Sequence, residues 1–316
     1  MNTDIVDRLR GVAVGAAVGD ALGMSLEFGP AIPLDRLVRA MQPGRLPAGA
    51  FTDDTEMALA LADSLLERCP LDAENLAQHF VAWYRAGPSD VGIQTSSVLG
   101  RLMRGADWQA AVDAVQQAKP NSAGNGSVMR CWPAALAHWD DRDRLLADSR
   151  LQSQVTHGHP ECVAGSAFIN VAIYTLVRGT EPRETVRRAL DQVDMPSGLR
   201  QAIEAAPSKS RAALPNSGWV RHTIESAVWG MLTTNSFEEA VVQVVNLGND
   251  ADTAGAVVGA LAGAAYGLQA IPAAWRAALH GEWPLRSGSR WDEARLVALA
   301  DRLAGSGASS GGGGSD

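Results

Sequence analysis

The chain has 316 residues, of which 46% are hydrophobic, and a formal net charge of −8. This length suits one large domain or two small ones, and the apolar content is enough for a substantial core. The acidic balance and the lack of a basic stripe argue against a nucleic-acid-binding face. No run of eighteen uninterrupted apolar residues occurs, so no membrane span is expected.

Three cysteines, Cys69, Cys131 and Cys162, are few and widely spaced. An odd number at this spacing predicts buried thiols in a reducing compartment, not a disulfide framework or a zinc site. The first residues, Met-Asn-Thr-Asp, lack the basic and apolar regions of a secretory signal. A cytoplasmic location is therefore expected.

Apolar residues recur at helical spacing along the chain, and β-branched alternation is scarce. The first helix is expected from residue 6, and its small residues up to Gly19 let another helix approach closely. Further helices are expected at residues 57–66, 76–84, 98–103, 108–118, 128–138, 144–155, 163–177, 185–193, 199–205, 220–232, 237–246, 254–266, 273–279 and 292–303. No internal linker interrupts them, so the pattern predicts a single all-α domain over residues 1–304. Residues 305–316 are Gly/Ser-rich and predict a flexible tail with no part in the fold.

Two short acidic segments of similar composition, residues 51–55 and 248–253, each precede an apolar helical run. Either segment alone is typical of a helix N-cap with acidic residues in the first turn. Together they supply the hard oxygen ligands that Mg²⁺ and Mn²⁺ prefer, and four carboxylates with two hydroxyls suit two metal ions better than one. The candidate metal ligands are Thr52, Asp53, Asp54, Asp250, Asp252 and Thr253.

Two glycine-rich segments are candidate phosphate-binding elements. The turn at residues 19–23, which precedes Glu27, either exposes backbone amides or serves close helix packing. The segment Gly124-Asn125-Gly126-Ser127 is expected to open a helix at Val128. Free N–H groups at such a helix start form an anion seat, although a plain helix start has the same pattern.

Four polar or aromatic residues complete the candidate list. His157 and His159 precede a helix, and their spacing is more typical of a structural turn than of a zinc site. Asp90 is either a helix cap or an acid that faces a cationic substrate group. Trp219 is either a core residue or a platform on which a base stacks.

Five segments in a fixed order resemble the ADP-ribosylglycohydrolase family. They are residues 18–23 with Glu27, residues 52–57, residues 123–130, residues 156–160 and residues 249–253. Within the family the chain is most similar to the bacterial dinitrogenase reductase-activating glycohydrolase group. The segment that begins at Asp90 and the continuation from Cys131 to Ala137 carry this second likeness.

The resemblance implies an all-α orthogonal multi-helix bundle with a binuclear Mg²⁺ or Mn²⁺ centre. It implies hydrolysis of the glycosidic bond at C1″ of the distal ribose, with an ADP-ribosylated protein as substrate and ADP-ribose as product. The six candidate ligands match the family's metal ligands, and Glu27 matches an acid beside the metals. Asp90 matches an acid that faces the arginine side. Gly124, Asn125, Gly126, Ser127 and His157 match residues that hold the diphosphate and the distal ribose.

The expected catalytic acids are Glu27, Asp53 and Asp54, any of which is placed to accept a proton from the attacking water. Three departures from the activating-enzyme pattern lie near the substrate mouth. The chain has Ser127-Val128 in place of Ala-Ala, Trp219 in place of a tyrosine, and a shorter segment between Glu27 and Thr52. Arginine is the expected target; hydrolysis of serine-linked or nucleic-acid ADP-ribosylation, and a non-catalytic ADP-ribose binder, are the alternatives.

Overall fold

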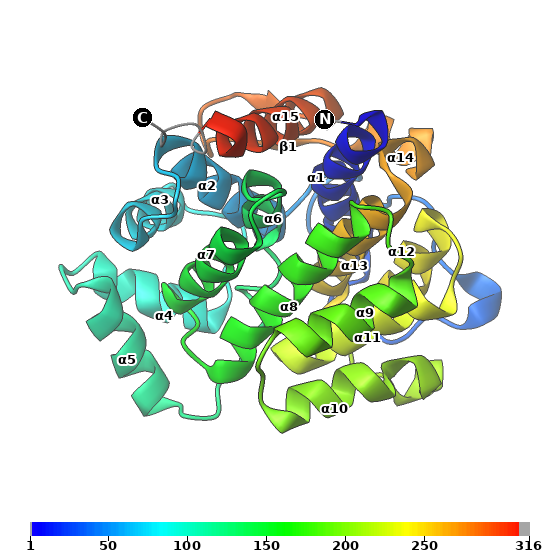
Figure 1. The fold of residues 1–316 in the computed structure, drawn as a ribbon, viewed down its shortest axis with the longest axis horizontal. Helices are drawn as coiled ribbons and strands as arrows, with labels where there is room; N and C mark the ends of the chain where they lie inside the picture. The colour runs from blue at the N-terminus through cyan, green and yellow to red at the C-terminus, as the bar shows by residue number, and fades with distance from the viewer. Residues whose placement is uncertain (1, 310–316) are drawn as a thin grey trace, which may run out of the picture.

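The computed structural model describes residues 2–309 of the chain, with side chains described as far as Gly305. The described residues form α-helices, five short 3₁₀ helices and one two-stranded antiparallel sheet (Figure 1). The α-helices are α1 (Thr3–Gly23), α2 (Asp53–Glu67), α3 (Ala73–Arg85), α4 (Ile93–Leu102), α5 (Trp108–Ala118), α6 (Trp132–Ala137), α7 (Arg142–Gln154), α8 (Pro160–Leu176), α9 (Pro182–Gln192), α10 (Ser197–Ala205), α11 (Val220–Thr233), α12 (Phe237–Val245), α13 (Ala251–Tyr266), α14 (Ala273–Ala278) and α15 (Glu293–Ser309). The 3₁₀ helices are η1 (Met24–Leu26), η2 (Leu34–Arg36), η3 (Ala206–Ser208), η4 (Arg211–Ala213) and η5 (Leu268–Ala270), and the strands are β1 (Gly281–Glu282) and β2 (Arg290–Trp291).

The all-α prediction is confirmed, but several helix boundaries differ from the expected ones. The helix expected from residue 98, for example, begins at Ile93. The helix expected from residue 128 begins only at Trp132, because residues 124–130 form a turn. The helix expected to end at Leu303 continues as α15 to Ser309, beyond the predicted start of the tail. The rest of the predicted tail, residues 310–316, lies outside the described residues.

Helices α1 and α13 lie side by side and form the centre of the fold (Figure 1). Glycines face each other along the contact. A Cβ atom added at Gly19 would lie 1.9 Å from the carbonyl oxygen of Gly255, and one added at Gly255 would lie 2.3 Å from that of Gly19. The glycines therefore permit a backbone-to-backbone approach that no other residue allows, as the small residues near Gly19 predicted.

The segment Thr3–Leu26 is long and apolar enough to cross a membrane by length and composition. Its most apolar window is 83% buried within the fold. The helix packs against α13, α15 and the residues of η5, so its apolar surface is used by the core.

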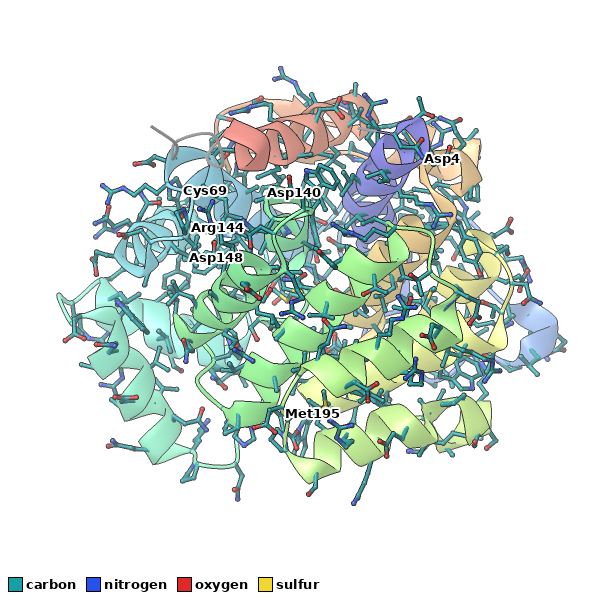
Figure 2. All side chains as sticks on the ribbon, viewed as in Figure 1. Asp4, Cys69, Asp140, Arg144, Asp148 and Met195 are labelled. Atoms are coloured by element: carbon teal, nitrogen blue, oxygen red, sulfur yellow. The ribbon has the colours of Figure 1, made fainter. Side chains whose placement is uncertain are left out.

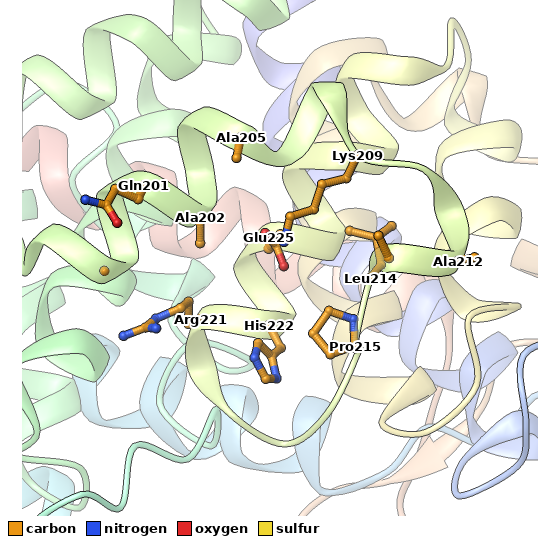
Figure 3. Close-up of a pocket in the computed structure, with 12 residues that line it drawn as sticks. Gln201, Ala202, Ala205, Lys209, Ala212, Leu214, Pro215, Arg221, His222 and Glu225 are labelled. Atoms are coloured by element: carbon orange, nitrogen blue, oxygen red, sulfur yellow. Dashed lines mark ion pairs between the residues drawn. The ribbon is translucent and has the colours of Figure 1, made fainter.

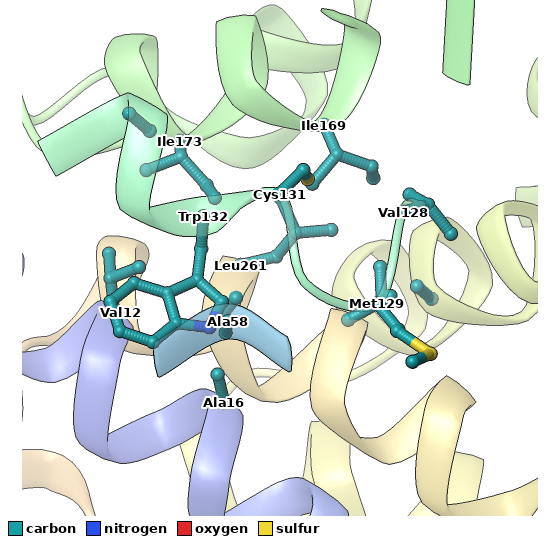
Figure 4. Packing of buried hydrophobic residues seen from close by; sticks show 14 of the residues in the cluster. Val12, Ala16, Ala58, Val128, Met129, Cys131, Trp132, Ile169, Ile173 and Leu261 are labelled. Atoms are coloured by element: carbon teal, nitrogen blue, oxygen red, sulfur yellow. The ribbon is translucent and has the colours of Figure 1, made fainter. Parts of the chain in front are cut away.

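The core is continuous around these two helices. Figure 4 shows Trp132 of α6 packed beside Val12 and Ala16 of α1 and Ala58 of α2. Trp132 is 2% exposed, and burial of so large a side chain contributes strongly to stability. The core therefore ties α6 to α1 and to α2, the helix that begins with the first acidic segment.

A buried hydrogen bond between His138 and Asp148 anchors the α7 side of the molecule. The Nε2 atom of His138 lies 2.6 Å from Asp148 of α7, and the same carboxylate accepts a hydrogen bond from the backbone N–H of Leu71. Figure 2 shows Asp148 near Cys69 on this side of the fold. The three cysteines are free; Cys131 and Cys162 are buried, whereas Cys69 is only half-buried.

Candidate active site

Asp20, near the end of α1, fixes the position of the first acidic segment. Its carboxylate is fully buried and accepts hydrogen bonds from the backbone N–H groups of Thr52 and Thr55 and from the Thr55 hydroxyl. The start of α2 is thereby held against the end of α1. Asp20 is therefore a positioning residue that lies beneath the site.

The second acidic segment is brought to the same place by α13. A Cβ atom at Gly23 would lie 2.5 Å from the Cα of Asp252, so the end of α1 touches the start of α13 directly. Both acidic segments begin helices, α2 and α13, as predicted. The two helix starts therefore meet at one end of α1.

A cavity of about 490 Å³ opens where these helix starts meet. Six carboxylates line it, and none of its lining residues is a lysine or arginine within the described chain. Of the residues predicted from the sequence, those that line it are Glu27, Asp53, Asp54, Asp90, Gly124, Asn125, Gly126, His157, Asp250, Asp252 and Thr253. The structure thus brings together most of the predicted site from segments far apart in the chain.

The remaining predicted residues do not line the cavity. Ser127 is fully buried, and its hydroxyl accepts hydrogen bonds from Ser153 and Ser166. Trp219 is 38% exposed and donates its Nε1–H to Glu161. Thr52 is buried, and its hydroxyl donates to Asp54 at 3.1 Å. Ser127 and Trp219 thus form their side-chain hydrogen bonds outside the lining, whereas Thr52 supports the lining residue Asp54.

Burial dominates the electrostatics of the acidic residues. It raises the pKa of Asp53, Asp54 and Asp252 well above the usual aspartate value, and nearby carboxylates raise it further. Burial also raises the pKa of Glu56 to about 7, against a hydrogen bond from Trp83 that lowers it. So many buried acids repel one another, and a cation between them would relieve this cost.

The carboxylates already have other partners in the described chain. Asp250 accepts a 2.8 Å hydrogen bond from Asn125 Nδ2, and Asp252 forms an ion pair with Arg45. No three His, Cys, Asp or Glu side chains of residues 2–305 converge as a ready-made metal site. The Oδ1 atom of Asp54, however, is buried without a hydrogen-bond partner, which leaves a hard oxygen donor free. The donor chemistry therefore fits Mg²⁺ or Mn²⁺ once the side chains around Asp252 rearrange.

The segment from Gly124 to Arg130 is a turn and not the predicted helix start. Asn125 N–H donates to the carbonyl of Gly218, so it is not free for an anion. Arg130 is fully buried, and its guanidinium donates to the carbonyl of Gly126 and to Thr156. This buried guanidinium holds the segment as a turn, which the glycine pattern alone did not indicate.

His157 presents one ring nitrogen to the cavity. The Thr156 hydroxyl accepts from Arg130, and we assign its single hydrogen to Nδ1 of His157, 2.8 Å away. Nε2 is then the protonated nitrogen of the neutral ring. Burial and the charge of Arg130 hold the pKa of His157 well below its usual value. A Cβ atom at Gly126 would lie 3.1 Å from Nε2, so glycine is needed beside this ring.

Sequence reasoning missed Arg45 entirely. Its guanidinium lies 2.9 Å from Glu27, 3.0 Å from Asp90 and 3.3 Å from Asp252. Arg45 belongs to the irregular chain between η1 and α2, where periodicity gives no signal. Gln94 and Thr95 of α4 also line the cavity and were not predicted. Two adjacent polar residues in the first turn of a helix could have indicated them as candidate binding residues.

A second cavity, of about 530 Å³, lies between α10 and α11. Figure 3 shows Lys209 extended toward Glu225, and the two form a 2.5 Å ion pair. None of the residues predicted to form the site lines this cavity. The acidic cavity is therefore the candidate active site.

Comparison with known proteins agrees with this geometry. The model of the ADP-ribosylglycohydrolase family matches residues 1–312. The chain belongs to the ADP-ribosylglycohydrolase family. It is 36% identical over 282 residues to ADP-ribosylarginine hydrolase Tri1 of Pseudomonas putida, a match that covers 85% of this chain and 73% of that protein.

Two further relatives of the family extend the comparison. ADP-ribosyl-[dinitrogen reductase] glycohydrolase of Rhodospirillum rubrum is 34% identical, over 85% of this chain and 89% of that protein. A solved structure named ADP-ribosylglycohydrolase-related protein complex superposes with a TM-score of 0.81 at 33% identity, over 97% of this chain and 100% of that one. The family and the all-α fold predicted from the sequence are thus confirmed.

Proposed function

We propose that the chain is a metal-dependent hydrolase that removes ADP-ribose from arginine side chains of modified proteins. The bond cleaved is the glycosidic bond at C1″ of the distal ribose. The observation that carries the proposal is that one cavity collects both acidic segments, the Gly124–Gly126 turn and His157. The similarity to an ADP-ribosylarginine hydrolase of Pseudomonas putida supports the arginine linkage, and the similarity to the ADP-ribosyl-[dinitrogen reductase] glycohydrolase of Rhodospirillum rubrum supports a protein substrate.

The proposed cofactor is a pair of Mg²⁺ or Mn²⁺ ions. Thr52, Asp53 and Asp54 from the start of α2, and Asp250, Asp252 and Thr253 from the start of α13, would hold them. When bound, such ions act as Lewis acids and lower the pKa of water. The unpartnered Asp54 Oδ1 and the repulsion among buried carboxylates support this assignment.

The neutral ring of His157 binds the sugar–phosphate part of the substrate. A protonated Nε2 donates one hydrogen bond to a ribose or phosphate oxygen and adds no charge to the cavity. Arg130 and Thr156 keep the ring in this orientation because they fix Nδ1 as the acceptor. His157 is therefore a substrate-binding residue and not the general acid.

The reacting bond lies on the acidic side of the cavity. Cleavage at C1″ develops positive charge on the ribose, and the surrounding carboxylates stabilise that charge. Glu27, Asp53 and Asp54 lie within the same lining and are the candidates to accept the proton of the attacking water. Burial raises the pKa of Glu27 above its ordinary value, and a raised pKa makes a carboxylate a stronger base.

The substrate guanidinium is proposed to lie at Asp90, at the mouth. Asp90 is 33% exposed at its side chain and already pairs with a guanidinium, that of Arg45, at 3.0 Å. Carboxylates bind guanidinium groups well because the charges and the planar donor fork match. Asp90 would therefore orient the leaving group for protonation as the bond breaks.

A panel of modified substrates tests the proposal. Proteins that carry ADP-ribose on arginine or on serine are incubated with the chain and Mg²⁺ or Mn²⁺, and released ADP-ribose is measured. We expect release from arginine, and its loss in both Asp54→Ala and Asp252→Ala. Arg39→Gln, which changes an exposed ion pair, is the control and should retain full turnover. Undiminished turnover in either aspartate variant would overturn the metal assignment.

A further inference from the structure

Arg45 pairs with three of the carboxylates that line the acidic cavity, although it is not itself a lining residue. Its Nε donates to Glu27 at 2.9 Å, and its Nη2 lies 3.0 Å from Asp90 and 3.3 Å from Asp252. Asp252 is a proposed metal ligand, whereas Asp90 is the proposed partner of the substrate guanidinium. The Arg45 side chain thus contacts both a proposed metal ligand and the proposed binding residue for the substrate guanidinium.

The backbone around Arg45 is built to reach this position. A Cβ atom at Gly44 would lie 2.9 Å from the Cα of Ser25, so Gly44 packs directly against the segment that carries Glu27. Gly44 also donates its N–H to the carbonyl of Leu46, which closes a tight turn around Arg45. The Arg45 side chain is 28% exposed and lies at the cavity edge, where it has solvent to move into.

We propose that Arg45 and a divalent cation bind Asp252 in alternation, so that metal binding displaces Arg45 and frees Asp90 for the substrate. The inference rests on the metal centre of the proposed function and adds its regulation. Arg45 stabilises the carboxylates of Asp90 and Asp252 when no cation is bound. Because its release exposes Asp90, the substrate guanidinium can bind there only after the metal has bound.

Charge and distance make simultaneous binding unfavourable. The Arg45 guanidinium lies 3.3 Å from the carboxylate of Asp252, so a divalent cation bound to the same carboxylate would repel it. Arg45 Nη2 contacts Oδ2 of Asp252, while Oδ1 of Asp252 accepts from the N–H of Thr253. The contact of Arg45 with Oδ2 is the one that a bound cation would weaken, because the backbone N–H of Thr253 carries no net charge.

While Arg45 is paired with Asp252, the metal cannot bind there. The apparent metal affinity is therefore the intrinsic affinity multiplied by the fraction of molecules in which Arg45 has left Asp252. Removal of the Arg45 guanidinium should therefore tighten metal binding. A purely structural role predicts the opposite sign, because damage to a binding site weakens affinity. The direction of the change separates the two roles.

Calorimetric titration with Mn²⁺ alone tests the inference on the metal-free full chain. We expect Arg45→Gln to bind Mn²⁺ at least about tenfold more tightly than the wild type. Arg39→Gln is the matched control, because it removes the same charge from the same irregular segment without touching the cavity. It should bind Mn²⁺ as the wild type does.

A crystal structure of the wild-type chain with Mn²⁺ is the second measurement. The inference expects Arg45 to have left Asp252. Arg45 still paired with Asp252 beside a bound ion, or equal Mn²⁺ affinity in the wild type and Arg45→Gln, overturns the inference and leaves the proposed function standing. Absence of Mn²⁺ binding in both proteins overturns the proposed metal centre and the inference together.

Discussion

The hydroxyl of Thr55 donates a 2.6 Å hydrogen bond to the buried carboxylate of Asp20. This contact joins the end of α1 to the start of α2. Because α1 also packs along α13 through facing glycines, the same helix positions both acidic segments. The active site is thus assembled by α1, although α1 contributes no lining residue within the described chain.

Replacement of Asp20 by asparagine should destabilise the protein. The amide presents N–H groups toward the Thr52 and Thr55 donors and leaves buried hydrogen-bonding groups unpaired. We expect the free energy of unfolding to fall by about 3 kcal/mol, measured by chemical denaturation. Thr55→Val removes one donor and should cost about 1 kcal/mol. An Asp20→Asn variant as stable as the wild type would contradict the positioning role.

Addition of a methyl group at Gly19 should separate α1 from α13. Its Cβ would lie 1.9 Å from the carbonyl oxygen of Gly255, so the backbones must move apart. Overpacking of this kind costs about 3 kcal/mol, against about 1 kcal/mol gained in helix propensity. The melting temperature of Gly19→Ala should fall clearly. Gly100→Ala in α4 is the control, since the nearest atom is the flexible end of Arg104 at 3.6 Å, and it should be neutral or stabilising.

His157 should make stability fall at acidic pH. Burial and Arg130 hold its pKa well below the usual value, so the unfolded chain binds a proton that the folded chain does not. Stability therefore rises with pH up to about 6.5 and is lost as the pH falls below it, by up to about 1.4 kcal/mol per pH unit for this one group.

A matched pair of denaturation series from pH 4 to pH 8 checks this expectation. His157→Gln carries no titrating group, so its stability should depend less steeply on pH than that of the wild type in the acidic range. Above pH 7 the free energies of unfolding of the two proteins should change with pH in the same way. They should differ by a constant amount, which is the contribution of the contacts that His157→Gln removes. Equal slopes in the acidic range would show that His157 is charged in the folded protein.

Asp90→Asn should weaken substrate binding more than turnover. Asp90 lies at the mouth and is proposed to pair with the substrate guanidinium, which is present before the reaction begins. Loss of such a charge-assisted pair costs about 1.4 kcal/mol, which is about a tenfold rise in KM. Steady-state kinetics on arginine-linked substrate checks this. A tenfold loss in kcat at constant KM would instead place Asp90 in the chemical step.

The sequence predicted those parts of the site that depend on a short local pattern of residues. Asp53 and Asp252 follow the pattern of acids at a helix start, and Gly19 follows the pattern of a close helix contact, so their surroundings were foreseen. The prediction of a helix start at Val128 was wrong because the turn depends on Arg130, which donates to the carbonyls of Gly126 and Gln152. Arg45 gave no signal, because its role depends on three carboxylates that the fold brings together. Ser127 was predicted to bind substrate, but its hydroxyl lies in the core, where it accepts a hydrogen bond from Ser153.

The central claim is that the two acidic segments form one metal-dependent site for ADP-ribosylarginine. The most direct measurement is ADP-ribose release from an arginine-modified protein by the wild-type chain before chelation, after chelation, and after return of Mg²⁺ or Mn²⁺. The account predicts release, its loss with chelator, and its recovery with either metal. Full release by the chelated, metal-free protein would contradict it.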